Sequence, residues 1–493
     1  MASSKGQDVT TKNDEYTREL LFVGGEFRAS TGSDSYEVIE AATENVLGRS
    51  VLATEADIDG AVAAARAALV GPWGALTIDE RADMLGAFAS ALKSKGRSTS
   101  RLVTRENGMP IALSGGVNGL GPAMILDYYA QLIRSSSRSD VRPSVFGGRT
   151  DVQRSPVGVV AAITPWNYPQ PLAAMKLAPA LAAGCTVVLK PAPETALDAF
   201  AFAEAAIEAG LPAGVLNVVP AGREVSSYLV SHPGVDKVAF TGSTGAGRAI
   251  GEVCGRLLRP VTLELGGKSA ALIAEDADLD IVARAILDVS LVNNGQTCHA
   301  STRILAPRSR YAEVVDAVTE AVGSLTVGDP LDKATQIGPL VSAAQRERVL
   351  GYIADGRDSG YRVTTGGGVP STHPKGWFVE PTVFVDVDNS ARIAQEEIFG
   401  PVLTVIGYDT EDDAIEIANA SEYGLGGTVW TADEQHGLDL ARRIESGSVG
   451  INYYALDFSS PFGGVKSSGL GRELGPEGIA PYFTSKSIYF ERP

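Results

Sequence analysis

Residues 157–257 alternate strand-like and helix-like segments more regularly than any other part of the chain. Runs rich in valine and isoleucine, such as VGVVAAIT, TVVLK, VLNVVP and KVAFTGS, are each followed by a segment of helix length. Strands of this composition, separated by helices, are typical of a parallel sheet that helices cover on both faces. Ligands of such sheets bind at the carboxyl ends of the strands. We therefore expect an α/β protein with its site at that edge.

A second α/β rhythm follows the first. Its strand-like runs are SAALIAE, TRILAP, VLTVIGY and TVWTA, and helix-like segments separate them. Ahead of the first rhythm, short strand-like runs in residues 20–52 meet at a Gly-Gly pair, which is a hairpin signal. Alanine-rich amphipathic segments come next, and residues 101–110 and 123–136 are each expected to form a separate helix. A chain of 493 residues with this organisation is expected to form two or three domains.

Composition narrows the class of partner. A net charge of −17 argues against nucleic acid or an anionic membrane as the main partner. Three cysteines fit a reducing compartment, and no apolar run reaches the roughly 18 residues that a membrane helix needs. Residues 1–18 are polar, lack the apolar core of a signal peptide and are expected to be a disordered tail. We therefore expect a cytoplasmic protein, and four histidines without a helical pair spacing predict no bound metal.

The stretch LVNNGQTCHA, residues 291–300, contains the strongest candidate nucleophile. An apolar helical run ends in an Asn-Gly turn, and Cys298 follows on what should be a short loop. Reactive side chains are often placed on loops that a rigid scaffold holds. A free cysteine is more often a buried and inert small hydrophobe, so the loop alone does not establish a nucleophile.

Two further polar residues stand at the ends of predicted strands. Glu264 closes the apolar run VTLE, where burial would raise its pKa toward the range that a general base needs. An edge-strand glutamate facing water is the alternative. Asn167, in TPWNYP, follows the first strand of the sheet and could donate to a developing oxyanion. The same asparagine beside a proline also fits a plain turn residue.

The sequence contains a glycine turn suited to a phosphate but no strict dinucleotide motif. Gly242-Ser-Thr-Gly245-Ala-Gly247 follows the strand KVAFT and would offer backbone N–H groups at a helix start. A tight turn explains it equally well. The spacing rules out a P-loop at Gly267-Lys268-Ser269, and no GxSxG nucleophile elbow occurs.

Seven motifs occur together in one order: ITPWNYP, VVLKPAPET, VAFTGST, LELGGKS, NNGQTC, EEIFGPV and SPFGGVKSSGLGRELG. In order and spacing they resemble the aldehyde dehydrogenase superfamily, from about residue 20 to 490. The resemblance implies a hydrolytic, NAD(P)-dependent enzyme that oxidises an aldehyde to its carboxylic acid through a cysteine thiohemiacetal and thioester. It also implies a Rossmann-like parallel-sheet cofactor domain, an α/β catalytic domain and a small β bridging arm.

The resemblance also assigns expected roles. Cys298 is expected to be the nucleophile, Glu264 the base, and Asn167 with the Cys298 backbone N–H the oxyanion hole. The expected coenzyme is NAD, with NADP left open. Its expected contacts are Trp166, Lys190, Gly242, Ser243, Glu397 and Phe399.

The same resemblance places the domain boundaries. The NAD(P)-binding domain is expected at 19–133 and 155–265, and the catalytic domain at 266–465. The arginine-dotted residues 134–154 and the terminal residues 480–493 are expected to form an oligomerisation arm. The arm would pair subunits by sheet extension into a homodimer or homotetramer.

The chain departs from the family pattern at two places. Many NAD-preferring members carry a glutamate three residues after the lysine, where this chain has Pro193 and then Glu194. A missing carboxylate there leaves no negative charge to repel a 2′-phosphate, so NADP acceptance stays open. Some members carry a second candidate base after GRELG, where this chain has Pro476 followed by Glu477.

Substrate identity is the least constrained prediction. Aromatic and apolar side chains are expected to line the entry funnel and to favour an apolar or aromatic aldehyde: Tyr168, Leu172, Met175, Tyr453, Tyr454 and Phe458. Core packing would explain any one of these aromatics equally well. Two alternatives stay open: a CoA-acylating aldehyde dehydrogenase, and a non-catalytic binding or structural protein of the same fold.

Overall fold

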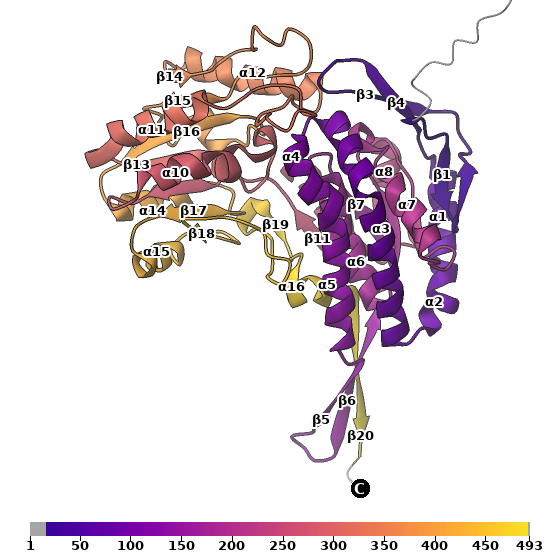
Figure 1. Ribbon diagram of the computed structural model, residues 1–493. Helices are drawn as coiled ribbons and strands as arrows, with labels where there is room; N and C mark the ends of the chain where they lie inside the picture. The colour runs from indigo at the N-terminus through magenta and orange to yellow at the C-terminus, as the bar shows by residue number, and fades with distance from the viewer. Residues whose placement is uncertain (1–15, 492–493) are drawn as a thin grey trace, which may run out of the picture.

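Two twisted sheets and a projecting three-stranded arm organise the fold of this computed structural model, which describes residues 16–491 (Figure 1). The larger sheet has eight strands, and its central five are parallel. In spatial order its strands are β19 (Gly469–Leu470), β11 (Val261–Glu264), β10 (Lys237–Thr241), β7 (Val159–Ile163), β8 (Thr186–Lys190), β9 (Leu216–Val218), β1 (Leu20–Val23) and β2 (Glu26–Ala29). The predicted parallel sheet is therefore confirmed.

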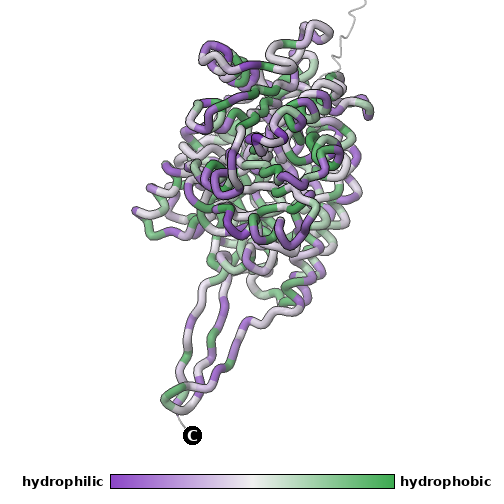
Figure 2. The backbone as a smooth tube through the Cα atoms, turned by 90° about the vertical axis from the view of Figure 1, so that its left-hand side faces the viewer, coloured by the Kyte–Doolittle hydropathy of each residue, from purple (hydrophilic) through white to green (hydrophobic). Residues whose placement is uncertain are grey.

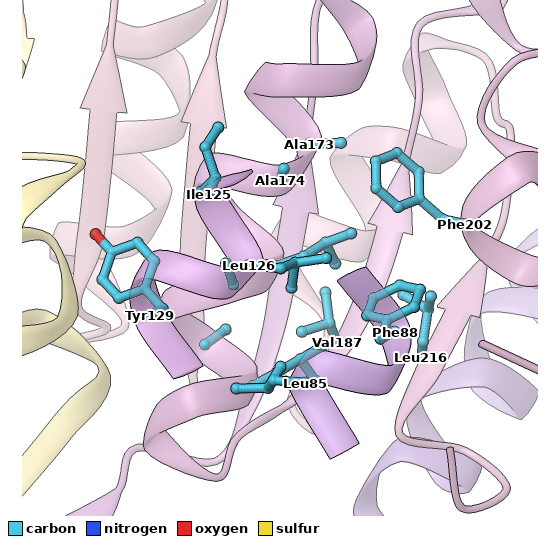
Figure 3. Close-up of a cluster of buried hydrophobic side chains, with 14 of the residues drawn as sticks. Leu85, Phe88, Ile125, Leu126, Tyr129, Ala173, Ala174, Val187, Phe202 and Leu216 are labelled. Atoms are coloured by element: carbon cyan, nitrogen blue, oxygen red, sulfur yellow. The ribbon is translucent and has the colours of Figure 1, made fainter. Parts of the chain in front are cut away.

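Helices cover both faces of this sheet. Its central strands are therefore buried throughout, and their side chains alternate between two cores. One core packs against α3 (Ile78–Asn107), α5 (Gly121–Arg134), α6 (Pro169–Ala183) and α7 (Phe200–Glu208). In it, Phe88, Leu126, Val187 and Phe202 point toward one another (Figure 3). The other core packs against α1 (Glu55–Val70), α8 (Arg223–Ser231) and α9 (Thr244–Arg256).

Helix α3 corrects one prediction. Residues 101–107 are the last two turns of this single helix of 30 residues, and no separate helix begins there. Gly96 does not end the helix, because its missing side chain lets the backbone of Gly119 approach: a Cβ on Gly96 would lie 2.3 Å from that carbonyl oxygen. The helix ends at Gly108, whose φ of +80° is left-handed. The helix predicted at 123–136 is confirmed as α5.

The second sheet has seven strands, of which only β14 is antiparallel to its neighbour. Its order is β14 (Arg362–Thr365), β15 (Thr382–Val385), β16 (Val402–Tyr408), β13 (Arg303–Pro307), β12 (Ala270–Ile273), β17 (Gly427–Trp430) and β18 (Gly450–Ile451). Its helices are α10 (Leu279–Ile286), α11 (Tyr311–Gly323), α12 (Ala343–Asp358), α13 (Arg392–Gln395), α14 (Glu411–Asn419) and α15 (Glu434–Ala441).

The arm projects away from both sheets (Figures 1 and 2). It is an antiparallel sheet of β5 (Ser139–Pro143), β6 (Arg149–Pro156) and β20 (Phe483–Phe490). Two segments more than 300 residues apart in sequence thus form one unit. At the tip between β5 and β6, Val145 and Phe146 are 92% and 85% exposed.

The chain ends connect to this frame in two ways. Strands β3 (Ser35–Ile39) and β4 (Val46–Val51) form a hairpin, and Arg18 makes two backbone hydrogen bonds along β4. Arg18 therefore belongs to the folded part, whereas residues 1–15 of the expected disordered tail lie outside the described residues. After the second sheet, the chain returns to the first through β19 and α16 (Gly475–Ile479), a segment that the predicted domain boundaries had left unassigned.

Two searches of residues 16–491 complete the description. No single helix in this range is long and apolar enough to cross a membrane, and one bent pair, residues 55–75 with 78–107, passes by length and composition only. In the same range, no three histidine, cysteine or acidic side chains gather where they could hold a metal ion.

Candidate active site

The Cys298 loop leaves helix α10 through a π-turn and a short 3₁₀ turn. Asn293 and Asn294 adopt left-handed backbone angles, with φ of 54° and 61°. Asparagine tolerates this region better than most residues do, which explains why two asparagines stand here. Cys298 follows on the predicted loop and is half-buried.

Side-chain amides fix the loop to its surroundings. Asn294 donates to the carbonyls of Gly108 and Pro339 at 3.0 and 2.9 Å, and its own carbonyl accepts the N–H of Gly338 at 2.6 Å. Gln296 accepts the N–H of Val341 at 3.0 Å. Since these partners come from the end of α3 and from the segment before α12, the loop is held from both sides.

Asn167 joins the same network. Its Nδ2 donates to the carbonyl of Gln296 at 3.0 Å, and its own carbonyl accepts Asn293 and Asn107 side chains at 2.9 and 3.1 Å. The neighbouring Tyr168 hydroxyl lies 2.7 Å from Oγ1 of Thr297. The turn after β7 and the Cys298 loop are therefore bonded together, although 129 residues separate them.

Glu264 ends β11 and is 2% exposed, so it is not an edge-strand glutamate facing water. Neither of its carboxylate oxygens has a hydrogen-bond partner among the described residues. Burial raises its pKa well above the usual value, the nearby Glu473 raises it further, and Lys176 and Arg472 oppose the rise. A raised pKa makes the ionised carboxylate a stronger base than an ordinary glutamate.

Lys176 and Glu473 form a buried ion pair beside Glu264 that the sequence interpretation missed. The two groups are 2.7 Å apart and at most 2% exposed, and Lys176 Nζ also donates to Oγ1 of Thr241. Thr241 lies directly across from Glu264 in the pairing of β10 with β11. A signal existed: Lys176 is the only charged residue in α6, and a buried lysine requires a partner.

The Cys298 thiol faces both carboxylates of the site. Burial raises its pKa above the usual value, and Glu397 and Glu264 raise it further. The thiol is therefore protonated at neutral pH and needs a base. The missing side chain of Gly267 lets its backbone lie against the Cys298 loop, because a Cβ there would lie 2.3 Å from the Cys298 carbonyl oxygen.

A cavity of about 720 Å³ opens at the carboxyl ends of β7, β8 and β10. Lys190, whose burial lowers its pKa to about 8, and Pro193 lie on one side of it. Ser243, which caps the first turn of α9, lies on another. Gly245 leaves open space beside that turn. The lysine and the start of α9 suit a negatively charged ligand at this edge of the sheet. The residues that line the cavity are Ile163, Lys190, Pro193, Ala221, Gly222, Arg223, Ser226, Ser227, Val230, Phe240, Ser243, Gly245, Ala246, Ala249, Ile250 and Val253.

Glu397 lies between this cavity's strand ends and the Cys298 loop. Its carboxylate accepts the N–H of Gly267 at 3.1 Å, and burial raises its pKa to about 7. Phe399 packs edge-on against Trp166 with ring centres 5.3 Å apart. Of the predicted cofactor contacts, Lys190 and Ser243 line the large cavity, whereas Glu397 and Phe399 line a separate small pocket together with Thr297 of the Cys298 loop.

The chain closely matches known proteins over nearly its whole length. A profile of the aldehyde dehydrogenase family matches residues 27–488. The chain belongs to this family. Geranial dehydrogenase of Castellaniella defragrans is 54% identical over 470 residues, which cover 95% of this chain and 98% of that protein.

Two solved structures extend the match to the fold. An aldehyde dehydrogenase of Mycobacterium tuberculosis in complex with NAD+ is 48% identical, with a TM-score of 0.94 over 96% of this chain and 98% of that one. A Pseudomonas syringae aldehyde dehydrogenase with NAD+ and octanal is 37% identical, with a TM-score of 0.93 over 97% and 98%. This protein is therefore an NAD(P)-dependent aldehyde dehydrogenase, as the motifs predicted.

The residues predicted for the substrate funnel of this aldehyde dehydrogenase differ in exposure. Leu172 and Met175 are buried in the core around α6, at 8% and 2% exposed. Tyr168 and Phe458 are half-buried and pack against that core, as Cys298 does. Tyr453 is 67% exposed and lies toward solvent.

Tyr454 contacts the Cys298 loop directly. It stacks on His299 with ring centres 4.8 Å apart, and Phe462 meets the same imidazole edge-on at 6.0 Å. Burial lowers the pKa of His299 to about 4, so the imidazole is neutral. His299 thus forms part of an aromatic wall in this aldehyde dehydrogenase.

The two departures from the family pattern have different surroundings. Pro193 lines the large cavity, and Glu194 is not among its wall residues. Glu477 is exposed on α16, whereas Glu473, four residues earlier, is the carboxylate beside Glu264.

Proposed function

We propose that this aldehyde dehydrogenase oxidises apolar aldehydes to carboxylic acids through a covalent bond to Cys298. One observation carries the proposal: a buried carboxylate without a hydrogen-bond partner, Glu264, lies beside a protonated thiol. The adjoining amide of Asn167 is tied to the loop that bears this thiol.

The first step couples a proton transfer to the attack of the sulfur. Glu264 takes the Cys298 proton as the sulfur attacks the aldehyde carbon, so the S–C bond forms while the carbonyl π bond becomes an oxyanion. An amide nitrogen carries two N–H groups, and Asn167 uses one on Gln296. The other, with the Cys298 backbone N–H, stabilises the oxyanion.

The residues around the cavity fit the expected coenzyme. Lys190 and the turn at Gly242-Ser243 would hold its ribose and phosphates, and Glu397 its nicotinamide ribose. NAD(P)+, when bound, supplies the hydride acceptor that turns the thiohemiacetal into a thioester. Glu264 then returns its proton toward the Lys176–Glu473 pair and deprotonates a water, which cleaves the thioester and frees the acid.

Apolar aldehydes suit the surroundings of the thiol. Tyr168, Phe458 and the wall formed by His299, Tyr454 and Phe462 present uncharged surface beside Cys298. Relatives that act on geranial or bind octanal support the same class.

Both coenzymes should be accepted. No acidic side chain is among the cavity's wall residues, which include Arg223, Lys190 and Pro193. A cation near the ribose favours a 2′-phosphate rather than repelling it.

A panel of aldehydes, each run with NAD and with NADP, tests these statements. Octanal and geranial should be oxidised with a higher kcat/KM than the cationic betaine aldehyde, and Cys298→Ala should abolish NADH formation while still binding coenzyme. Full activity in Cys298→Ala would disprove the covalent route. Formation of an acyl-CoA when CoA is added would show thiolysis in place of hydrolysis.

We further propose that the arm pairs two copies of the chain. Its three strands leave exposed edges and exposed apolar side chains: Val141, Val145, Phe146, Tyr489 and Phe490. Phe146→Ser should shift the protein to a smaller species in analytical ultracentrifugation. An unchanged sedimentation coefficient would count against the arm as an interface.

A further inference from the structure

Four polar side chains lie on one face of β10 and β11, with Ala239 among them. Strand side chains alternate, so Lys237 and Thr241 of β10 share a face with Thr262 and Glu264 of β11. The apolar residues between them, such as Phe240 and Leu263, belong to the core on the opposite face. The polar face is the one that α6 covers with Lys176.

Lys237 is the charged residue on this face that has no role in the proposed catalytic steps. Its side chain is fully buried, its ammonium donates to Oγ1 of Thr262 at 2.7 Å, and it lies 5.0 Å from the ring centre of Tyr482. Burial lowers its pKa to about 8, and the charge of Glu473 counters this fall. An ammonium kept in such a place, without a carboxylate in direct contact, is costly and calls for an explanation.

The balance of buried charges explains why this ammonium is buried here. The buried charged groups beside this face are two lysines, Lys176 and Lys237, and two carboxyls, Glu473 and Glu264. With both lysines charged, these four groups are neutral only when both carboxylates are ionised. Without Lys237, a single buried lysine would face two carboxylates, and only the half-exposed Arg472 would add positive charge near Glu264.

We propose that Lys237 is a positioning residue for the catalytic base: its buried ammonium, acting through Glu473 and Lys176, provides the positive charge that lets Glu264 ionise. The inference rests on the proposed role of Glu264. The other groups facing the cluster are Tyr129 of α5, Tyr482, Cys185, Cys254, Cys298 and the half-exposed Arg472. Burial and Glu473 raise the pKa of both tyrosines, so they stay neutral at catalytic pH.

The pH profile of kcat/KM tests the proposal. Lys237→Met keeps the length of the side chain and removes its charge, so Glu264 should ionise at higher pH. We expect the acid limb to move by about one unit toward alkaline pH, with activity recovering above it, as the loss of one buried charge predicts. Lys237→Arg should keep the limb near its original position.

A second variant, Thr262→Val, supports the interpretation of the pH profile. Thr262→Val removes only the hydrogen bond to the ammonium and should move the limb in the same direction by a smaller amount. If Lys237→Met does not fold, this variant decides alone. A purely structural role would lower kcat or the Tm and leave the limb unmoved in both variants, and that result would overturn the inference.

Glu264→Gln separates this inference from the proposed function. A Glu264→Gln enzyme that retains full aldehyde oxidation would show that the base is misassigned. An inactive Glu264→Gln enzyme together with an unmoved limb in Lys237→Met would leave the base in place and reject the role of Lys237 only.

Discussion

The loop that bears Cys298 and the strand end that bears Glu264 are held by opposite kinds of interaction. The amide network (Asn107, Asn167, Asn293, Asn294 and Gln296) fixes the loop through neutral hydrogen bonds. The charge cluster (Lys176, Lys237, Glu264 and Glu473) places an ion pair beside the carboxyl of Glu264 and leaves both oxygens of that carboxyl without a hydrogen bond. Neutral amides fix a position at any pH, whereas buried charges set a proton affinity. The proposed nucleophile is thus placed by geometry and the proposed base by electrostatics.

Removing the proposed base, Glu264, should lower the activity most. Glu264→Gln keeps the shape of the side chain but cannot accept a proton, so kcat should fall by roughly 10² to 10⁴. Rapid mixing with octanal and NAD should reveal whether thiol attack or thioester hydrolysis becomes limiting. Glu477→Gln, on the surface of α16, is the matched control and should behave as the parent enzyme. Equal losses in both variants would contradict the assignment.

Removing the amide of Asn167 should cost less. Asn167→Ala loses a proposed oxyanion donor, and kcat should fall roughly 10²-fold with little change in KM. Tyr168→Phe supplies the comparison, because it removes only the neighbouring hydrogen bond to Thr297, worth about 1 kcal/mol. Since that bond holds the loop without touching the reacting atoms, Tyr168→Phe should lose less than about tenfold. Similar losses in the two variants would reduce Asn167 to a structural part of the network.

The sequence predicted Cys298, Asn167 and Glu264 better than the charged residues that surround Glu264. Strand periodicity placed Asn167 and Glu264 at strand ends, and the carboxyl ends of parallel strands meet at one edge. The motif resemblance then connected both to Cys298. Local patterns and family motifs were enough because each of these residues follows a recognisable strand or turn.

The charge cluster depends on contacts that local patterns do not encode. Lys176 and Glu473 lie 297 residues apart, one in the middle of an apolar helix and the other in a β-bridge to Phe462 between β19 and α16. The alternation of KVAFT and TLE did show polar residues on one face, but only the strand register reveals that they share it. Helix α3 is a similar case, because Gly96 is tolerated only through its contact with Gly119.

The smallest expected effect concerns Glu397, which adjoins both regions. Its folded pKa of about 7 lies above the unfolded value of about 4.3, so the native state binds the extra proton between these limits. Stability should therefore fall as pH rises through this window and then level off. Glu397→Gln has no such proton to lose, so its Tm should drop less than the parent's between pH 5 and pH 8, by a few degrees. Differential scanning calorimetry of the coenzyme-free enzyme measures the difference, with Glu477→Gln as the control. Parallel Tm profiles in Glu397→Gln and the parent would show that the folded state does not raise the pKa of Glu397. Burial would then perturb the carboxyl of Glu264 but not that of Glu397.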